Sequence, residues 1–143
     1  MGTVAMKFDH VRLDVCDIER SAEYYTAALG LREVVRYTVD QRVILQVAPE
    51  GLPPGIELWQ EAGLTPVPHR TQHAAFSVSD VPRLVEHVRS LGYPITEEPY
   101  RIGEETVAFL TDPDGHLIEL NDFRGRGIAE AGSGLPARTE HDG

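Results

Sequence analysis

The sequence predicts an α+β protein made of two paired βαβββ modules that form a curved cleft, and three observations support this. The expected order strand, helix, strand, strand, strand occurs twice along the chain. Corresponding residues of the two copies lie 62 or 63 positions apart, as His10 with His73 and Gly30 with Gly92 show. Each copy also carries a histidine on its first strand and a glutamate on its last. Two copies are too few for a solenoid and favour two similar sheets related by a pseudo-twofold axis.

The first module is expected over about residues 7–60. Residues 7–16 alternate apolar and polar side chains and are predicted to form a strand. Asp17 suits the N-cap of a helix over residues 18–29, which Gly30 would end. Three further strands are predicted, two in runs rich in β-branched and aromatic residues and one after a Pro-Pro-Gly sequence: 31–38, 41–47 and 55–60.

The second module is expected over about residues 72–123, after a polar, proline-containing linker at 61–71. Asp80 repeats the N-cap of Asp17, and Gly92 repeats the helix stop of Gly30. The predicted elements are a strand at 72–78, a helix at 81–91 and strands at 95–102, 105–111 and 116–121. The two modules make a single domain over residues 1–123, and the glycine-rich residues 124–143 are expected to form a flexible C-terminal tail.

Composition limits the classes of partner. The 143 residues carry a net charge of −10, which argues against a nucleic-acid or anionic-membrane surface. No apolar run approaches the roughly 18 residues of a membrane-spanning helix, and the N-terminus lacks a signal-peptide pattern. Cys16 is the single cysteine, so an internal disulfide is excluded and a reducing cytoplasm is the expected location.

Four polar residues occupy matching positions of the repeat: His10 and Glu57 in the first module, His73 and Glu119 in the second. Strand alternation places them all on the face of the sheet turned away from the helices. A charged carboxylate among apolar neighbours, such as Glu119, is costly unless something pairs with it. Two imidazoles and two carboxylates predict a site for one divalent ion, namely Zn, Ni, Co, Mn or Fe.

The tight turn Asp-Pro-Asp-Gly at 112–115 leads directly into the strand that carries Glu119. Together with Ile56-Glu57-Leu58, His73-Ala74-Ala75-Phe76 and the Leu-Gly-Leu sequence at 29–31, this motif resembles the vicinal oxygen chelate superfamily, and glyoxalase I and methylmalonyl-CoA epimerase in particular. The resemblance extends over residues 7–123. It implies paired modules around a metal held by the His/Glu quartet, a small-molecule carbonyl substrate, and a homodimer whose cleft is sometimes completed across subunits.

The sequence departs from both families at specific positions. Glyoxalase I usually has an arginine four residues after its first histidine, and here that position is Asp14, whose charge would repel a carboxylate-rich thiol such as glutathione. The asparagine usual after the first strand glutamate is also missing from Leu58-Trp59-Gln60-Glu61. The epimerase usually has glutamine in place of Glu57. The resemblance therefore leaves the reaction and the use of glutathione open.

The predicted chemistry is redox-neutral proton transfer beside a carbonyl, with Glu119 or Glu57 as the general base. This describes a metal-dependent lyase or isomerase. Arg12, Asp14, Trp59 and Tyr100 are the predicted substrate-binding residues, although Arg12 and Asp14 could equally pair with each other. Two alternatives stay open: a non-haem dioxygenase that uses two histidines and one carboxylate, and a metal-free protein that binds an antibiotic in an apolar cleft.

Overall fold

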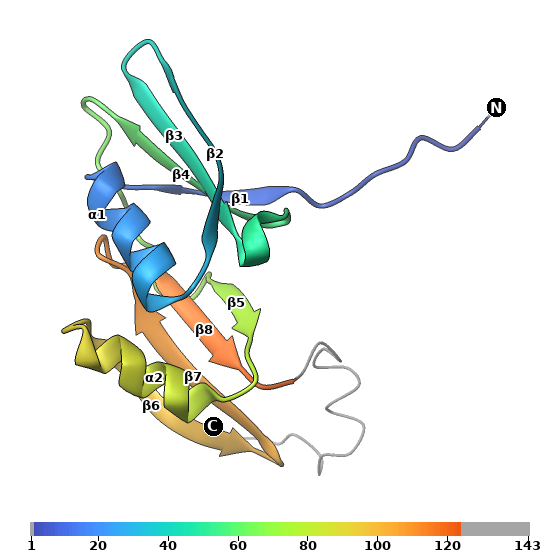
Figure 1. Ribbon diagram of the computed structural model, residues 1–143, viewed down its shortest axis with the longest axis vertical. Coiled ribbons are helices and arrows are strands. Elements are labelled where there is room, and N and C mark those ends of the chain that lie inside the picture. Colours follow the sequence, from blue (N-terminus) through green and yellow to red (C-terminus); the bar gives the residue numbers. More distant parts are fainter. Residues whose placement is uncertain (1, 124–143) are drawn as a thin grey trace. The chain divides into compact units, whose positions relative to one another are not determined.

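The computed structural model describes residues 2–123 (Figure 1). The predicted tail at 124–143 lies outside the described residues. The chain divides into two compact units, Met1–Pro68 and a second that begins at His69. Each unit contains one four-stranded mixed sheet, which confirms the predicted α+β class and the βαβββ order of each module.

The first unit has strand order β1-β4-β3-β2. β1 pairs with β4 in parallel, and the other neighbours are antiparallel. Its elements are β1 (His10–Asp14), α1 (Ile18–Glu23), η1 (Tyr24–Ala28), β2 (Arg32–Val39), β3 (Arg42–Ala48), η2 (Pro49–Gly51) and β4 (Gly55–Glu61). The first strand is thus shorter than predicted and begins at the histidine itself.

The second unit repeats this plan with strand order β5-β8-β7-β6, and its first and last strands again pair in parallel. Its elements are β5 (Ala74–Ser77), α2 (Val81–Ser90), β6 (Ile95–Ile102), β7 (Glu105–Thr111) and β8 (Leu117–Asn121). His73 therefore lies one residue before its strand rather than on it.

Both helices begin where the sequence predicts. The side chain of Asp17 accepts hydrogen bonds from the backbone N–H groups of Glu19 and Arg20, and Asp80 accepts one from Arg83. Gly30 and Gly92 follow the helices with φ of 75° and 88°, a conformation that glycine adopts without strain.

The first helix differs from the prediction in its second half. Only Ile18–Glu23 is α-helical, and Tyr24–Ala28 continues as a π-helix. The wider turn accompanies two consecutive, fully buried tyrosines, Tyr24 and Tyr25, whose rings meet edge to face at 5.3 Å. Residue spacing alone does not distinguish this local widening from an ordinary helix.

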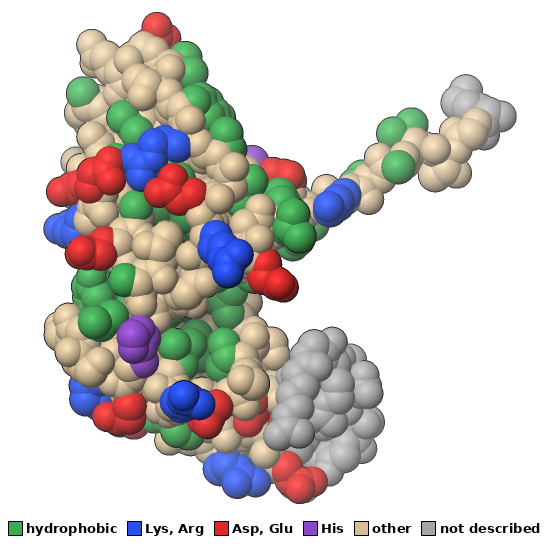
Figure 2. Space-filling model, in the orientation of Figure 1, with side chains coloured by type: hydrophobic (Ala, Val, Ile, Leu, Met, Phe, Trp, Pro, Cys, Tyr) green, Lys and Arg blue, Asp and Glu red, His purple; other side chains and the backbone are tan. Residues whose placement is uncertain are grey.

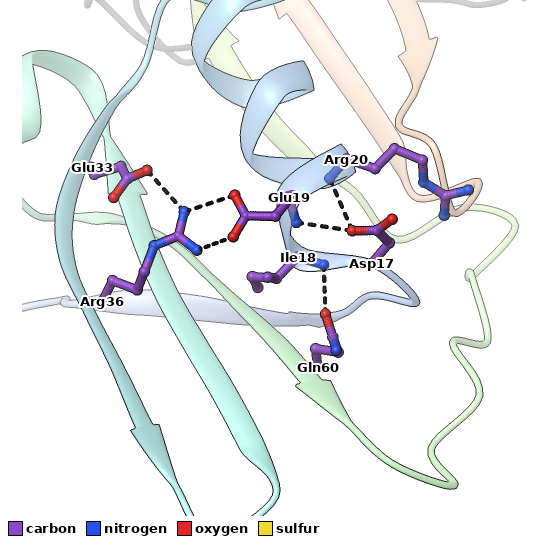
Figure 3. A network of polar contacts seen from close by, with 7 residues as sticks. All are labelled: Asp17, Ile18, Glu19, Arg20, Glu33, Arg36 and Gln60. Carbon is purple, nitrogen blue, oxygen red and sulfur yellow. Dashed lines mark hydrogen bonds and ion pairs between the residues drawn. The ribbon is translucent and has the colours of Figure 1, made fainter.

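Contacts from two strands fix α1 on one face of the first sheet (Figure 3). The side-chain oxygen of Gln60 accepts a hydrogen bond from the backbone N–H of Ile18 at 2.7 Å. Arg36 of β2 pairs with Glu19 at 2.6 Å. Because Gln60 points toward the helix, its neighbours Trp59 and Glu61 on β4 point to the opposite face.

Charged side chains of both signs share the visible surface. Figure 2 shows acidic and basic side chains interspersed on the visible face, rather than basic groups gathered into a patch. Within residues 2–123, no helix has the length and apolar character needed to cross a bilayer.

Candidate metal centre

The first unit brings one histidine and one glutamate together. Arg12 of β1 pairs with Glu57 of β4, so His10, two residues earlier, is a diagonal neighbour of Glu57 on the same face. Nε2 of His10 lies 3.4 Å from Oε2 of Glu57. The Glu57 side chain is only 13% exposed, so its carboxylate is largely buried against the sheet.

The second unit makes the same pair. Ala75 of β5 pairs with Glu119 of β8, and His73 stands two residues before Ala75. Nε2 of His73 lies 3.0 Å from Oε1 of Glu119, whose side chain is 17% exposed. The repeated pattern in the sequence therefore corresponds to a repeated contact in the structure.

The other ring nitrogen of each histidine is held by an acceptor. Nδ1 of His10 lies 2.6 Å from the carboxylate of Asp9, which also accepts a hydrogen bond from Gln46 at 3.2 Å. These two hydrogen bonds, that of His10 first, lower the pKa of the Asp9 carboxyl. Nδ1 of His73 donates to the backbone carbonyl of Thr71 at 2.7 Å. In both units Nδ1 is engaged, and Nε2 is the nitrogen that faces the glutamate.

This arrangement fits a divalent metal. Metal-binding histidines commonly donate one ring N–H to a carboxylate or carbonyl, which fixes the orientation of the ring and directs the other nitrogen to the ion. A neutral imidazole nitrogen and a carboxylate oxygen are donors that Zn, Ni, Co, Mn and Fe accept.

Three or more ligands do not come together within one unit. In the described part of the chain, no group of three or more His, Cys, Asp and Glu side chains is placed to hold a metal ion. The convergence of both pairs on one ion stays a prediction.

Asn121 and Phe109 support the pair of the second unit. Asn121 donates a hydrogen bond to Oε2 of Glu119 at 2.8 Å, and the ring of Phe109 meets that of His73 edge to face at 5.3 Å.

Burial, followed by the negative charges of Glu97 and Glu119, raises the pKa of the Tyr100 phenol. Tyr100 therefore stays a neutral hydrogen-bond donor near Glu119.

A cation–aromatic cluster lies beside the pair of the first unit, on the same face of the sheet. The Cζ atom of Arg12 lies 3.9 Å from the ring centroid of Trp59. Arg12 Nε donates to Asp14 at 2.7 Å, so Asp14 is neutralised by a neighbour on its own strand. The indole N–H of Trp59 donates to Glu61 at 2.9 Å, and Arg42 donates to the same oxygen at 3.1 Å.

Sequence reasoning missed Asp9, Gln46, Arg42 and Glu61. Alternation along β4 does place Glu61 on the face of Glu57 and Trp59, and this signal could have identified it. Arg42 and Gln46 required knowledge of the β3–β4 register, in which they oppose Glu61 and Glu57. To identify Asp9, one would have needed to know the path of the backbone just before β1.

The fold and these contacts define a class of protein: paired βαβββ modules, each with a His/Glu pair on the face away from its helix. A family model confirms this class. The Glyoxalase/Bleomycin resistance protein/Dioxygenase superfamily model matches residues 7–120, and the chain belongs to this superfamily.

Individual relatives agree. A lactoylglutathione lyase of Escherichia coli O157:H7 is 32% identical over 134 residues, which cover 86% of this chain and 98% of the relative. One from Arabidopsis thaliana is 33% identical, but the alignment covers 80% of this chain and only 43% of the longer plant protein. The solved glyoxalase I of Leishmania major, described as trypanothione-dependent, has a TM-score of 0.75 and 31% identity over 90% of this chain and 95% of its own.

Proposed function

We propose that the protein is a metal-dependent lyase or isomerase that transfers a proton next to a carbonyl group of a small chelating substrate. The observation that carries this proposal is the same contact in both units, where a histidine Nε2 faces a glutamate oxygen. The names of the relatives, lactoylglutathione lyases from bacteria and plants, support a lyase of this superfamily.

His10, Glu57, His73 and Glu119 are the proposed metal ligands. A bound divalent ion would act as a Lewis acid on the substrate's paired oxygens and acidify the neighbouring C–H bond. Because each unit supplies one His/Glu pair, a centre with all four ligands needs one first unit and one second unit. Two carboxylates balance the charge of a divalent ion, which suits proton transfer without a change of oxidation state.

Glu119 or Glu57 is the proposed general base. Its carboxylate takes the proton from the carbon beside the carbonyl, and the same carboxyl group returns it to the adjacent carbon or to the other face. Asn121 orients Glu119 by hydrogen bonding to Oε2. Oε1, which faces Nε2 of His73, is the oxygen proposed to take the proton. Tyr100, whose pKa is raised by burial, is the proposed hydrogen-bond donor to a substrate oxygen.

We also propose a homodimer in which the His/Glu pair of one subunit and that of its partner complete one metal centre. Neither unit supplies more than a pair from the described residues. The β2 side chains Val35, Tyr37 and Val39 are each more than 40% exposed. They oppose Gln46, Ile44 and Arg42, which puts them on the face of Glu57. Apolar surface of this kind is suited to association.

Metal binding and proton exchange together test the function. Protein purified without added metal should contain a divalent ion, or should show a higher melting temperature when one is added, because a ligand that binds only the folded state stabilises it. With a substrate in D₂O, the wild-type protein should put deuterium on the carbon beside the carbonyl. Glu119→Gln keeps a ligating oxygen but takes no proton, and Glu57→Gln is its matched variant.

The outcomes separate the candidate functions. Exchange that disappears in one glutamine variant identifies the base, whose loss should cost about 10²–10⁴-fold in rate. Oxygen uptake that follows turnover without exchange would replace the proposal with a dioxygenase. Protein that neither contains nor responds to Zn, Ni, Co, Mn or Fe would favour metal-free binding of a small molecule.

A further inference from the structure

The cation–aromatic cluster of the first unit has no counterpart in the second. Arg12 and Trp59 stand two residues after His10 and Glu57, respectively. The corresponding positions after His73 and Glu119 are Ala75 and Asn121. The second unit forms the same sheet without such a cluster, so the βαβββ fold does not require it.

The cluster lies next to the His/Glu pair on the same sheet. A strand rises about 3.3 Å per residue, so Arg12 is about 7 Å beyond His10 along β1, and Trp59 is about 7 Å beyond Glu57 along β4. Arg12 and Glu57 are direct partners in the β1–β4 pairing, which places both on one face. A small substrate held at the pair could therefore reach Arg12 with its other end.

Arg12 is held in place but retains hydrogen-bonding capacity. Its guanidinium lies over Trp59, with Cζ 3.9 Å from the ring centroid, and its Nε donates a hydrogen bond to Asp14. Within residues 2–123, Nε is the atom of Arg12 that donates a hydrogen bond to the protein. The Nη groups at the end of the guanidinium remain for a ligand, and 42% of the side chain is exposed.

Trp59, the platform under Arg12, is itself fixed. Its indole N–H donates to Glu61, and the Nε of Arg42 holds the same carboxylate oxygen. Arg42 also approaches the indole, with Cζ 6.0 Å from the ring centroid. Little ordering of these side chains is therefore left for the moment of binding.

Charge decides which anion fits. Asp14 pairs with Arg12, and Glu61 and Asp40 pair with Arg42, so the cluster has no excess positive charge before a ligand arrives. A planar carboxylate with one negative charge matches the edge of the guanidinium. A phosphate with two charges would face the nearby carboxylates of Asp14, Glu57 and Glu61.

We propose that Arg12, stacked on Trp59 and braced by Asp14, binds a carboxylate at the non-reacting end of the substrate. The proposal rests on the proposed function for the position of the reacting end. It assigns Asp14 the role of bracing Arg12 rather than repelling acidic substrates. The substrate class is a small carbonyl compound with chelating oxygens at one end and a carboxylate at the other.

Trp59 is the only tryptophan in the chain, so its fluorescence reports directly on the site. The first experiment titrates metal-free protein with glutarate, a dicarboxylate that needs no metal, and with inorganic phosphate. A saturable change in fluorescence on addition of glutarate is expected. The affinity for glutarate should be at least roughly tenfold weaker in Arg12→Gln, because a hydrogen bond to a charged group is lost. Arg12→Lys should not restore the affinity, since lysine lacks the planar guanidinium that binds a carboxylate with two hydrogen bonds and stacks on indole. Arg36→Gln, in an ion pair on the helix side, should bind as the wild type does.

The second experiment uses metal-loaded protein and two acids with the same chelating head. 2-Oxoglutarate carries a distal carboxylate, and 2-oxopentanoate lacks it. Calorimetry should give roughly tenfold tighter binding of 2-oxoglutarate, and Arg12→Gln should remove the difference. Because Arg12→Gln also changes the starting fluorescence of Trp59, calorimetry supplies the affinity independently of the fluorophore.

The outcomes distinguish this proposal from the proposed function. Arg12-dependent glutarate binding in a protein that takes up no metal would support the carboxylate site and overturn the metal-dependent reaction. Metal-dependent exchange with no discrimination between the two oxo acids would overturn the carboxylate site alone. Arg12-dependent binding of phosphate in preference to glutarate would overturn the assigned class, as would glutarate binding that Arg12→Gln leaves unchanged.

Discussion

His10 lies opposite Gly55 in the parallel pairing of β1 with β4. A Cβ atom at residue 55 would overlap the carbonyl oxygen of Val47 and lie 2.7 Å from Cβ of Ala48. Backbone atoms cannot yield as the end of a flexible side chain can. The position of the first proposed ligand thus depends on the absence of a side chain on the neighbouring strand.

Gly55→Ala should lower the free energy of unfolding by about 1–3 kcal/mol, the usual range for overpacking. It should also shift β4 relative to His10 and weaken metal binding. Denaturant unfolding and metal titration measure the two effects. Gly2→Ala is the control, because a Cβ there meets nothing within 4 Å. Equal stability of the two variants would contradict the steric argument.

Asp9→Asn should weaken metal binding by about 10–100-fold, the usual effect of removing a partner that orients a histidine ligand. The carboxylate of Asp9 holds Nδ1 of His10 at 2.6 Å, and an amide would do so less strongly. Competition with a chromophoric chelator measures the affinity. Glu33→Gln, an exposed carboxylate paired with Arg36 at 3.1 Å, should keep wild-type affinity. If both variants behave alike, the effect comes from overall charge and not from the orientation of His10.

Mixing two inactive variants tests the proposed dimer. His10→Ala spoils the pair of the first unit, and His73→Ala spoils that of the second. If each site joins the first unit of one subunit to the second unit of its partner, a mixed dimer regains one intact site. Random reassociation should then restore about a quarter of the wild-type activity, by the twofold symmetry of the assembly.

The mixing experiment has a simple control. His10→Ala mixed with Glu57→Ala removes two ligands of the same unit, so neither kind of site is repaired. Activity that stays at the level of the separate variants in both mixtures would place all four ligands in one chain. Affinity tagging of one variant, followed by co-purification of the untagged one, shows whether subunits exchange.

The fluorescence of Trp59 should respond to acid at a pH below 4.5. The hydrogen bond from the indole of Trp59, and then that of Arg42, lowers the pKa of the Glu61 carboxyl from its usual 4.5. A carboxyl whose pKa is lowered by folding stabilises the folded state above the unfolded-state pKa. That contribution disappears as the pH falls through the lower, folded-state pKa. The matched variant Glu61→Gln should lack this fluorescence transition, and an identical transition in both proteins would assign it to another group.

Periodicity and helix signals were sufficient to predict the order of elements and the two helix starts. Asp17 and Asp80 act through their own helices, so local sequence contains the information. The repeat similarly identified the two His/Glu pairs, since equivalent positions in equivalent folds make equivalent contacts. Binding of one ion by all four side chains depends on how the units are arranged. The alternation of side chains within a strand contains no information about that arrangement.

The residues around the pairs were harder to predict for a physical reason. Arg42 reaches Glu61 only because β3 and β4 pair in one particular register, and the connection at residues 49–54 sets that register. A shift of one residue would turn Arg42 toward the helix. The π-helical turn at Tyr24 also depends on packing that no local pattern specifies.

The two histidines differ in how their orientation is encoded. His73 is held by the backbone carbonyl of Thr71, which every residue type at position 71 would supply. His10 depends on the side chain of Asp9, which a single codon change removes. In directed evolution, the proposed ligand His10 is therefore the adjustable one. Libraries at residues 9 and 46 should alter metal preference, whereas substitutions at residue 71 should leave the proposed ligand His73 as it was.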